Sequence, residues 1–267
     1  MHYSGEALKE IEAGYSELRL RYRELAIRVF SFVGRLENEQ AREYMLHGVG
    51  RRLWLLQRCV DNMFRLFPAS RVEKLSDDDR LDLEINLHAF LINTYGIIEN
   101  IALAVAYENA LVGDDCERKL NAKKVSLFSR RFRRLLNPQL HSYLSGQTLG
   151  NWYRQYAKNY RDALAHRIPP YVPPAAVNDD EEQRFKNLER EMQAERDPSR
   201  IEALQQEQAR LGTSNPLFVH SFSEKANFVY LHPQLIADFR TVEEMLNKTI
   251  DYFYCGAVVG EEKERGI

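Results

Sequence analysis

An arginine and a histidine, Arg161 and His166, lie five residues apart in a segment where Pro169 and Pro170 end a predicted helix. A guanidinium carries a permanent positive charge and paired N–H donors that suit a phosphate group. An imidazole titrates near neutral pH, so it can accept or donate a proton. Side by side, these groups could bind a phosphodiester and cleave it.

The spacing itself is weak evidence. Arginines followed by a histidine with four to six residues in between occur at Arg42…His47, Arg134…His141 and Arg161…His166. Chance gives roughly two such pairs in a chain of this composition. Pro138 interrupts the second pair, which therefore cannot lie on one continuous helix. The first pair lies in a predicted helix that has no other feature of a site.

The surroundings of Arg161 distinguish the third pair. At ~100° per residue, Arg154 and Lys158 lie within about 60° of Arg161, and His166 lies at about 140°, with Asp162 between them. The pair therefore flanks a polar, positively charged face, and a helix C-terminus favours a charged imidazole. Two interpretations follow from the residues alone: a solvated, capped helix end, or a phosphate site.

The segment Tyr-Arg-Asp-Ala-Leu-Ala-His-Arg-Ile-Pro-Pro at 160–170 resembles the signature of HEPN domains, which are compact helical bundles. Their motif is an arginine, a polar residue, and a histidine four to six positions after the arginine. The run Leu-Ile-Asn-Thr-Tyr-Gly-Ile-Ile-Glu-Asn-Ile-Ala-Leu-Ala at 91–104 is similar to the long helix that precedes the motif in some HEPN-like proteins.

Many HEPN proteins are metal-independent endoribonucleases that act as dimers with facing motifs, and others are inactive interaction or RNA-binding modules. The resemblance implies catalytic roles for Arg161, Asp162 and His166, and it leaves open whether the chain is an enzyme. In an enzyme, His166 would move a proton while Arg161 held the phosphate. The resemblance also implies a toxin or defence role, a homodimer, RNA as a partner, and an antitoxin or other protein partner.

Basic residues near the motif and in the segment 118–134 are the candidates for RNA contact. That segment holds eight Lys or Arg and no acidic residue. Each phosphate contact would make binding more dependent on salt. The alternative for this segment is a solvated helix face whose long side chains pack over the bundle. The candidate residues are Arg154, Lys158, Arg167, Arg130, Arg131, Arg133 and Arg134.

Composition excludes several other classes of protein. The 267 residues are 44% hydrophobic and 28% charged, with a net charge of −2, so any nucleic-acid surface must be local. Three widely spaced cysteines argue against disulfides, and no HExxH pair or glycine-rich phosphate loop occurs. We therefore expect no metal and no cofactor. Met1 leads into polar residues and the longest apolar run is 101–107, so we expect a cytoplasmic chain without membrane contact.

Apolar spacing predicts long helices over about 8–36, 49–67, 81–111, 148–165 and 233–253. We therefore expect an all-α, HEPN-like up-and-down bundle that forms a single domain over 1–267. An insertion at 168–231 would interrupt it, with a proline-rich arm, a charged segment that is either two short helices or mobile chain, and a β-hairpin.

Two features leave alternatives open. The first helix carries apolar residues three and four apart, a spacing shared by bundle cores and by coiled-coil dimers. Glu99 and Asn100 interrupt an apolar helix, and they either bind a buried partner such as Arg161 or face solvent. The apolar residues of the first helix are Leu8, Ile11, Tyr15, Leu18, Tyr22, Leu25, Val29, Phe32 and Leu36.

Overall fold

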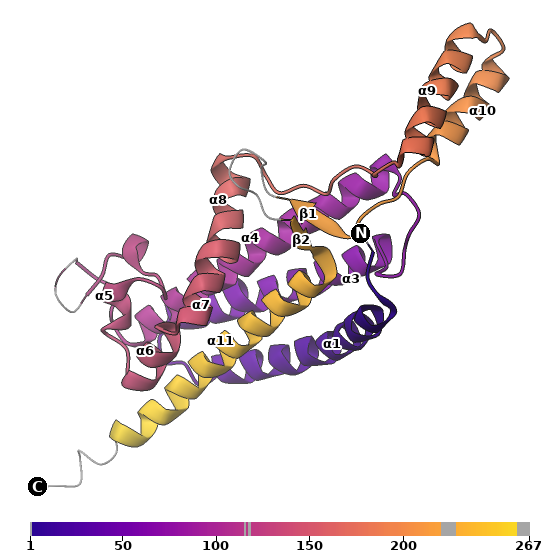
Figure 1. Ribbon diagram of the computed structural model, residues 1–267. Coiled ribbons are helices and arrows are strands. Elements are labelled where there is room, and N and C mark those ends of the chain that lie inside the picture. The colour runs from indigo at the N-terminus through magenta and orange to yellow at the C-terminus, as the bar shows by residue number, and fades with distance from the viewer. Residues whose placement is uncertain (1, 115, 117–118, 220–227, 261–267) are drawn as a thin grey trace, which may run out of the picture.

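Helix α1 (Gly5–Val33) buries the apolar seam that the sequence predicts, within this one chain. The computed structural model describes the chain except for residues 1, 115, 117–118, 220–227 and 261–267, and it describes side chains as far as Tyr254. Ser4 caps α1 by accepting a hydrogen bond from the backbone N–H of Ala7. The seam is therefore core, packed against α3 (Arg51–Leu66) and α11 (Leu231–Gly260) (Figure 1).

The second helical stretch runs without a break from α2 (Glu39–Glu43) through a π-helical segment (Tyr44–Gly50) into α3 (Arg51–Leu66). It begins earlier than expected and ends just before Pro68, as predicted. The π-helical segment contains wider turns than an α-helix, and such segments are frequent at functional sites. Here the segment packs against α1 and α4.

Helix α4 (Asp77–Glu108) lies at the centre of the bundle and contacts α3, α8 (Lys158–His166) and α11. The Ser76 side chain caps it by accepting a hydrogen bond from the backbone N–H of Asp79. Three aspartates in the first turn stabilise the helix through their interaction with the positive end of its dipole. Among the described helices, α4 alone has the length and apolar composition to cross a membrane, but 67% of that window is buried inside the molecule. A central bundle helix has these same properties.

The fourth predicted helix is also continuous, from α7 (Gln147–Trp152) through a second π-helical segment (Tyr153–Ala157) into α8 (Lys158–His166). The basic segment before it does not form one helix. It contains a 3₁₀ turn (Ala122–Lys124) and the one-turn helix α5 (Arg130–Arg133), and α6 (Pro138–Leu144) follows. The predicted single solvated helix face is therefore absent from this part of the structure.

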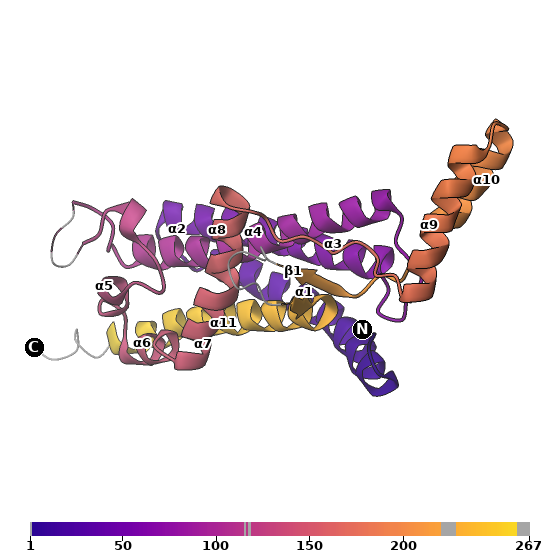
Figure 2. The same cartoon turned by 45° about the horizontal axis from the view of Figure 1, so that its top comes forward.

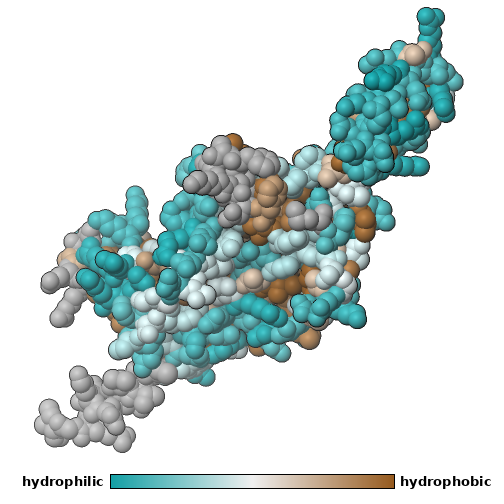
Figure 3. Space-filling model, viewed as in Figure 1, coloured by the Kyte–Doolittle hydropathy of each residue, from teal (hydrophilic) through white to brown (hydrophobic). Residues whose placement is uncertain are grey.

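The insertion begins as an extended segment, which pairs at Tyr171 with Val219 and at Ala176 with Thr213. It continues as two helices, α9 (Asp179–Ala194) and α10 (Pro198–Ala209), which project from the body as a hairpin with a hydrophilic surface (Figures 1 and 3). Leu188 and Leu204 form its small interior. Of the two expectations for the charged segment, paired short helices are the one observed.

Strands β1 (Leu217–Val219) and β2 (Phe228–Tyr230) pair antiparallel, so the expected hairpin is present as a short sheet. Its turn lies outside the described residues. Helix α11 (Leu231–Gly260) follows, starting two residues before Pro233 and continuing past Gly256. It lies below α3 and α4 in Figure 2 and runs parallel to α1, to which it is joined by the Arg21–Glu243 and Arg240–Glu17 ion pairs. The chain is thus mostly helical, as predicted.

Candidate functional site

Aromatic packing positions α8, the helix that carries the candidate motif. The ring of Tyr153 stacks on Phe128, with centroids 3.8 Å apart, and Tyr160 packs edge-on against Phe218 of β1. Tyr160 and Ala163 are buried between α8 and the core. This packing leaves the opposite side of α8 to solvent, as the helical spacing predicts.

Arg161 is fastened to the central helix. Its Cζ lies 4.3 Å from the centroid of the Tyr95 ring, and its Nη2 donates a 2.8 Å hydrogen bond to the Tyr95 hydroxyl. Its Nε is buried and has no hydrogen-bond partner, while the side chain as a whole is 26% exposed. Burial lowers the pKa of Arg161, but the Tyr95 hydrogen bond and the charges of Asp162 and Glu99 outweigh this and raise it. The guanidinium is therefore a fixed, permanent positive charge.

Asp162 joins two cations on the surface of α8. Its carboxylate lies 3.0 Å from Nη1 of Arg161 and accepts a hydrogen bond from Nζ of Lys158. Partial burial raises the pKa of Asp162, but the Lys158 hydrogen bond and the charge of Arg161 lower it by more. Asp162 is thus ionised at neutral pH, and it orients the guanidinium rather than transferring protons.

His166 is the last residue of α8 and is exposed. Among the described residues its ring has no hydrogen-bond partner, so both nitrogens are accessible to a ligand. Five residues along a helix correspond to a rise of about 7.5 Å and a turn of about 140°. Arg161 and His166 therefore share one end of α8 without sharing one face of it.

The other residues predicted to contact RNA near the motif are exposed, and they form hydrogen bonds or ion pairs within the chain. Arg154 donates to Asn151, and Arg167 folds back to donate to the carbonyl and the side chain of Asn159. Lys158 is held by Asp162. These residues give the surface around α8 its positive charge, and their hydrogen bonds fix their orientations.

Two arginines of the basic segment hydrogen-bond to nearby chain, and two others have no such bond among the described residues. Arg131 donates to the carbonyls of Cys116 and Lys119, and Arg133 donates to the carbonyl of Leu144 and to Ser145. These bonds tie irregular chain together. Arg130, the first residue of α5, and Arg134, which follows α5, are exposed, and they are the members of this group best placed to meet a phosphate.

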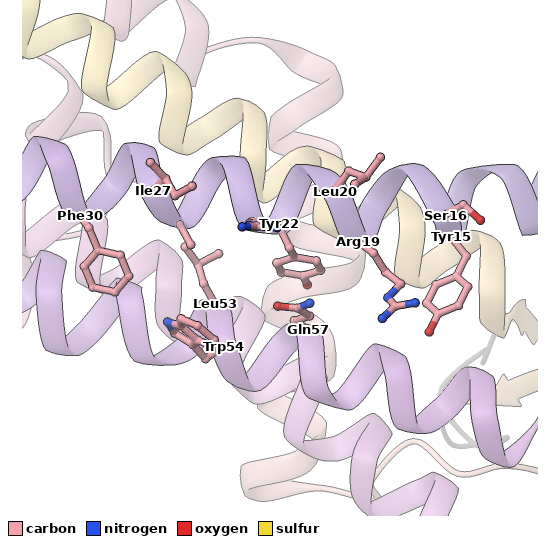
Figure 4. Close-up of a pocket in the computed structure, with 12 residues that line it drawn as sticks. Tyr15, Ser16, Arg19, Leu20, Tyr22, Ile27, Phe30, Leu53, Trp54 and Gln57 are labelled. Atoms are coloured by element: carbon pink, nitrogen blue, oxygen red, sulfur yellow. The ribbon is translucent and has the colours of Figure 1, made fainter.

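Neither Arg161 nor His166 lines any of four surface pockets in the described structure. The largest of these, about 820 Å³, is a groove between α1 and α3 (Figure 4). Leu20, Ile27 and Trp54 line it and are 67%, 58% and 61% exposed. The apolar seam of α1 did not predict this groove, because Leu20 and Ile27 lie off that seam. Their spacing of seven residues was the available signal.

Within the described residues, no group of three or more His, Cys, Asp or Glu side chains is arranged to hold a metal ion. Comparisons with known proteins found no match among family models, curated proteins or solved structures. The resemblance to HEPN domains is therefore carried by the residues of 91–104 and 160–170 alone.

Proposed function

We propose that the chain is an RNA-directed protein of the HEPN type and that α8 carries the site of a metal-independent endoribonuclease. The observation that carries this proposal is the state of His166, an exposed imidazole with no partner among the described residues. It lies five residues beyond a guanidinium fixed by Tyr95 and Asp162, at the same end of α8. A free imidazole next to fixed cations suits proton transfer on a bound phosphodiester.

The proposed site is shared between two chains. The 140° turn between Arg161 and His166 separates them on one helix. In a two-fold dimer, two copies of α8 would bring His166 of one chain toward the fixed arginine of the other. Two exposed cations beside the motif, Arg154 and Lys158, would hold the adjoining phosphates.

The chemistry follows from the groups present. The RNA 2′-oxygen attacks the adjacent phosphorus while His166 takes its proton, and the bond to the 5′-oxygen breaks. The leaving oxygen receives a proton from the imidazolium of the second chain. Arg161 stabilises the charge that develops on the phosphate oxygens. The products are a 2′,3′-cyclic phosphate and a 5′-hydroxyl end.

A substrate lacking the nucleophile tests this directly. Labelled single-stranded RNA and DNA of the same sequence are incubated with the protein in EDTA, and the ends of the products are identified. We expect RNA to be cleaved with cyclic-phosphate ends and DNA to stay intact. Cleavage of both polymers, a requirement for a divalent metal, or no cleavage of RNA would each contradict the enzyme proposal.

The α1–α3 groove supports a second candidate, a non-catalytic module that dimerises through its bundle. Arg23 lines the groove, and Glu12 lies eleven residues, about three turns, before it on the same face of α1. An antiparallel second copy of α1 would therefore set Glu12 against Arg23 while covering Leu20 and Ile27. Exposed apolar residues rimmed by opposite charges are typical of such an interface.

Two surface variants separate these candidates by oligomeric state in light scattering. Leu20→Glu places a charge in the groove, Arg154→Glu reverses a charge on α8, and Leu81→Glu is a control at an exposed leucine of α4. A dimer that is lost only in Leu20→Glu supports the interaction module. A dimer that is lost only in Arg154→Glu supports the shared α8 site.

A further inference from the structure

Arg52 of α3 is held against α4 by two asparagines. Its Nε donates to Oδ1 of Asn100 at 3.0 Å, and its Nη1 donates to Oδ1 of Asn93 at 2.7 Å. Asn93 in turn donates to the carbonyl of Ala89, so its amide is oriented with the oxygen toward Arg52. The planar guanidinium is thus fixed in one orientation before any ligand arrives.

Two glycines make room for this arrangement. A Cβ at Gly96 of α4 would lie 2.5 Å from Cζ of Arg52, and a Cβ at Gly48 would lie 2.7 Å from the side chain of Asn100. Any larger residue at either position would displace the cluster. Glycine in a helix lowers its stability by about 1 kcal/mol relative to alanine. At both positions, however, alanine would clash with the Arg52–Asn100 cluster.

The charge of Arg52 has no counter-ion within the described part of the chain. Its side-chain bonds go to neutral amides, and no described carboxylate lies within 4 Å of it. Arg80 and Arg161, which are also partly buried, each pair with an acid. A partly buried cation without an acid is expensive unless an anion completes its shell. Arg52 keeps further N–H groups free for that purpose.

Arg52 lines a pocket of about 600 Å³ that lies between the π-helical segment Tyr44–Gly50, α3 and α4. Arg51 and the exposed His47 also line it, so three basic side chains border one pocket. The π-helical turns carry His47 and Gly48, and a widened turn at this point is consistent with a binding role. A volume of this size suits a small ligand rather than a single ion.

The other lining residues indicate what the rest of the ligand is. The rings of Tyr44 and Tyr107 lie parallel within 15°, with centroids 5.7 Å apart, and both line the pocket. Glu43 and Gln40 also line it, and Glu43 lies about 12 Å along the helix from Arg51. The pocket therefore has a basic end, an aromatic wall and an end that accepts hydrogen bonds.

We propose that this pocket binds a nucleoside monophosphate. The phosphate would meet Arg52, Arg51 and His47, the base would pack on Tyr44 or Tyr107, and the ribose hydroxyls would donate to Glu43 or Gln40. This site is distinct from the α8 motif, and it does not depend on RNA cleavage there.

Calorimetric titration of the full chain with adenosine 5′-monophosphate, adenosine and inorganic phosphate tests the proposal. We expect adenosine 5′-monophosphate to bind at least tenfold more tightly than either fragment. Equal binding of adenosine and its monophosphate, or no binding of the monophosphate to the folded protein, would overturn the proposal.

Variants locate the site independently of folding. Arg51 is exposed, so Arg51→Gln preserves the fold and is expected to weaken binding at least fivefold, while Arg58→Gln, an exposed arginine of α3 outside the pocket, leaves it unchanged. Arg52→Gln is expected to abolish binding, with circular dichroism to confirm that it is folded. Unchanged binding in Arg51→Gln together with Arg52→Gln would place the ligand elsewhere and reject this pocket. A failure of RNA cleavage would leave these outcomes unaffected.

Discussion

Arg161 of α8 lies over the ring of Tyr95 in α4 and donates a hydrogen bond to the hydroxyl of the same residue. Tyr95 thus holds the candidate phosphate-binding group together with Asp162, whose carboxylate lies 3.0 Å from Nη1 of Arg161. The contact also joins the motif helix to the central helix of the bundle. The stability of the fold and the geometry of the candidate site are therefore linked through the contact between Tyr95 and Arg161.

Tyr95→Phe tests this link, because it removes the hydroxyl and retains the ring. We expect unfolding free energy, measured by urea denaturation, to fall by about 1.5 kcal/mol, the contribution of a hydrogen bond to a charged group. RNA cleavage should fall with it because the guanidinium is no longer held. Tyr143→Phe is the matched control, since the buried Tyr143 hydroxyl has no partner to lose. Equal effects of the two substitutions would show that the Tyr95 hydroxyl does not hold Arg161.

Asp238 of α11 makes stability fall as pH rises. Burial raises the pKa of its carboxyl from 3.8 to about 7, although Trp152 and Gln234 donate hydrogen bonds to it. Between pH 4 and 7 the folded state holds a proton that the unfolded state releases, so stability decreases across this window by about 4 kcal/mol at most. Asp238→Asn should remove this decline, as measured by denaturation at a series of pH values. A decline of the same size in the variant would assign it to other groups.

His232 acts in the opposite direction. Its Nε2 donates to the carbonyl of Phe67 and its Nδ1 accepts from the Tyr3 hydroxyl, while burial lowers its pKa from 6.5 to about 4. A depressed pKa contributes stability that is complete above pH 6.5 and is lost as pH falls toward 4. We expect His232→Asn to be less stable at pH 8 but to lose less stability on acidification. If His232→Asn loses as much stability as the wild type when the pH falls from 6.5 to 4, this assignment is contradicted.

Much of the fold follows from spacing, whereas the partners of individual side chains do not. The three-and-four spacing of Leu18, Tyr22 and Leu25 predicts a buried face, because a helix turns in a fixed way whatever surrounds it. The Tyr95–Arg161 contact joins residues 66 positions apart, so no local pattern could reveal it. Asn100 drew notice as a polar residue in an apolar helix, but its partner is Arg52 rather than Arg161, and Glu99 is exposed.

In the basic segment 118–134, too, the sequence did not predict the partners of individual side chains. Its density of arginines predicts a surface for RNA, but Arg131 and Arg133 satisfy backbone carbonyls of irregular chain that the sequence led us to expect as helix. The π-helical segments were also not predicted, because their residues have ordinary helix propensities and only tertiary packing selects the wider turn.

Gly96→Ala tests the nucleotide pocket through a residue that contacts no ligand. The new Cβ would occupy the space of the Arg52 guanidinium, so the side chain must leave its two asparagines. We expect adenosine 5′-monophosphate binding to weaken at least tenfold in calorimetry while the helix content is retained. Gly5→Ala is the control, since nothing lies within 4 Å of the added carbon there. Equal binding by both variants would show that the position of Arg52 is not required.

Cleavage of labelled RNA in EDTA by wild type, His166→Ala and His141→Ala tests the central claim most directly. Both histidines are exposed, so both substitutions should leave the fold intact, and His141 of α6 serves as the matched control. We expect wild type and His141→Ala to produce cyclic-phosphate ends at similar rates and His166→Ala to lose cleavage by at least a hundredfold. Undiminished cleavage by pure His166→Ala would contradict the assignment of the site to α8.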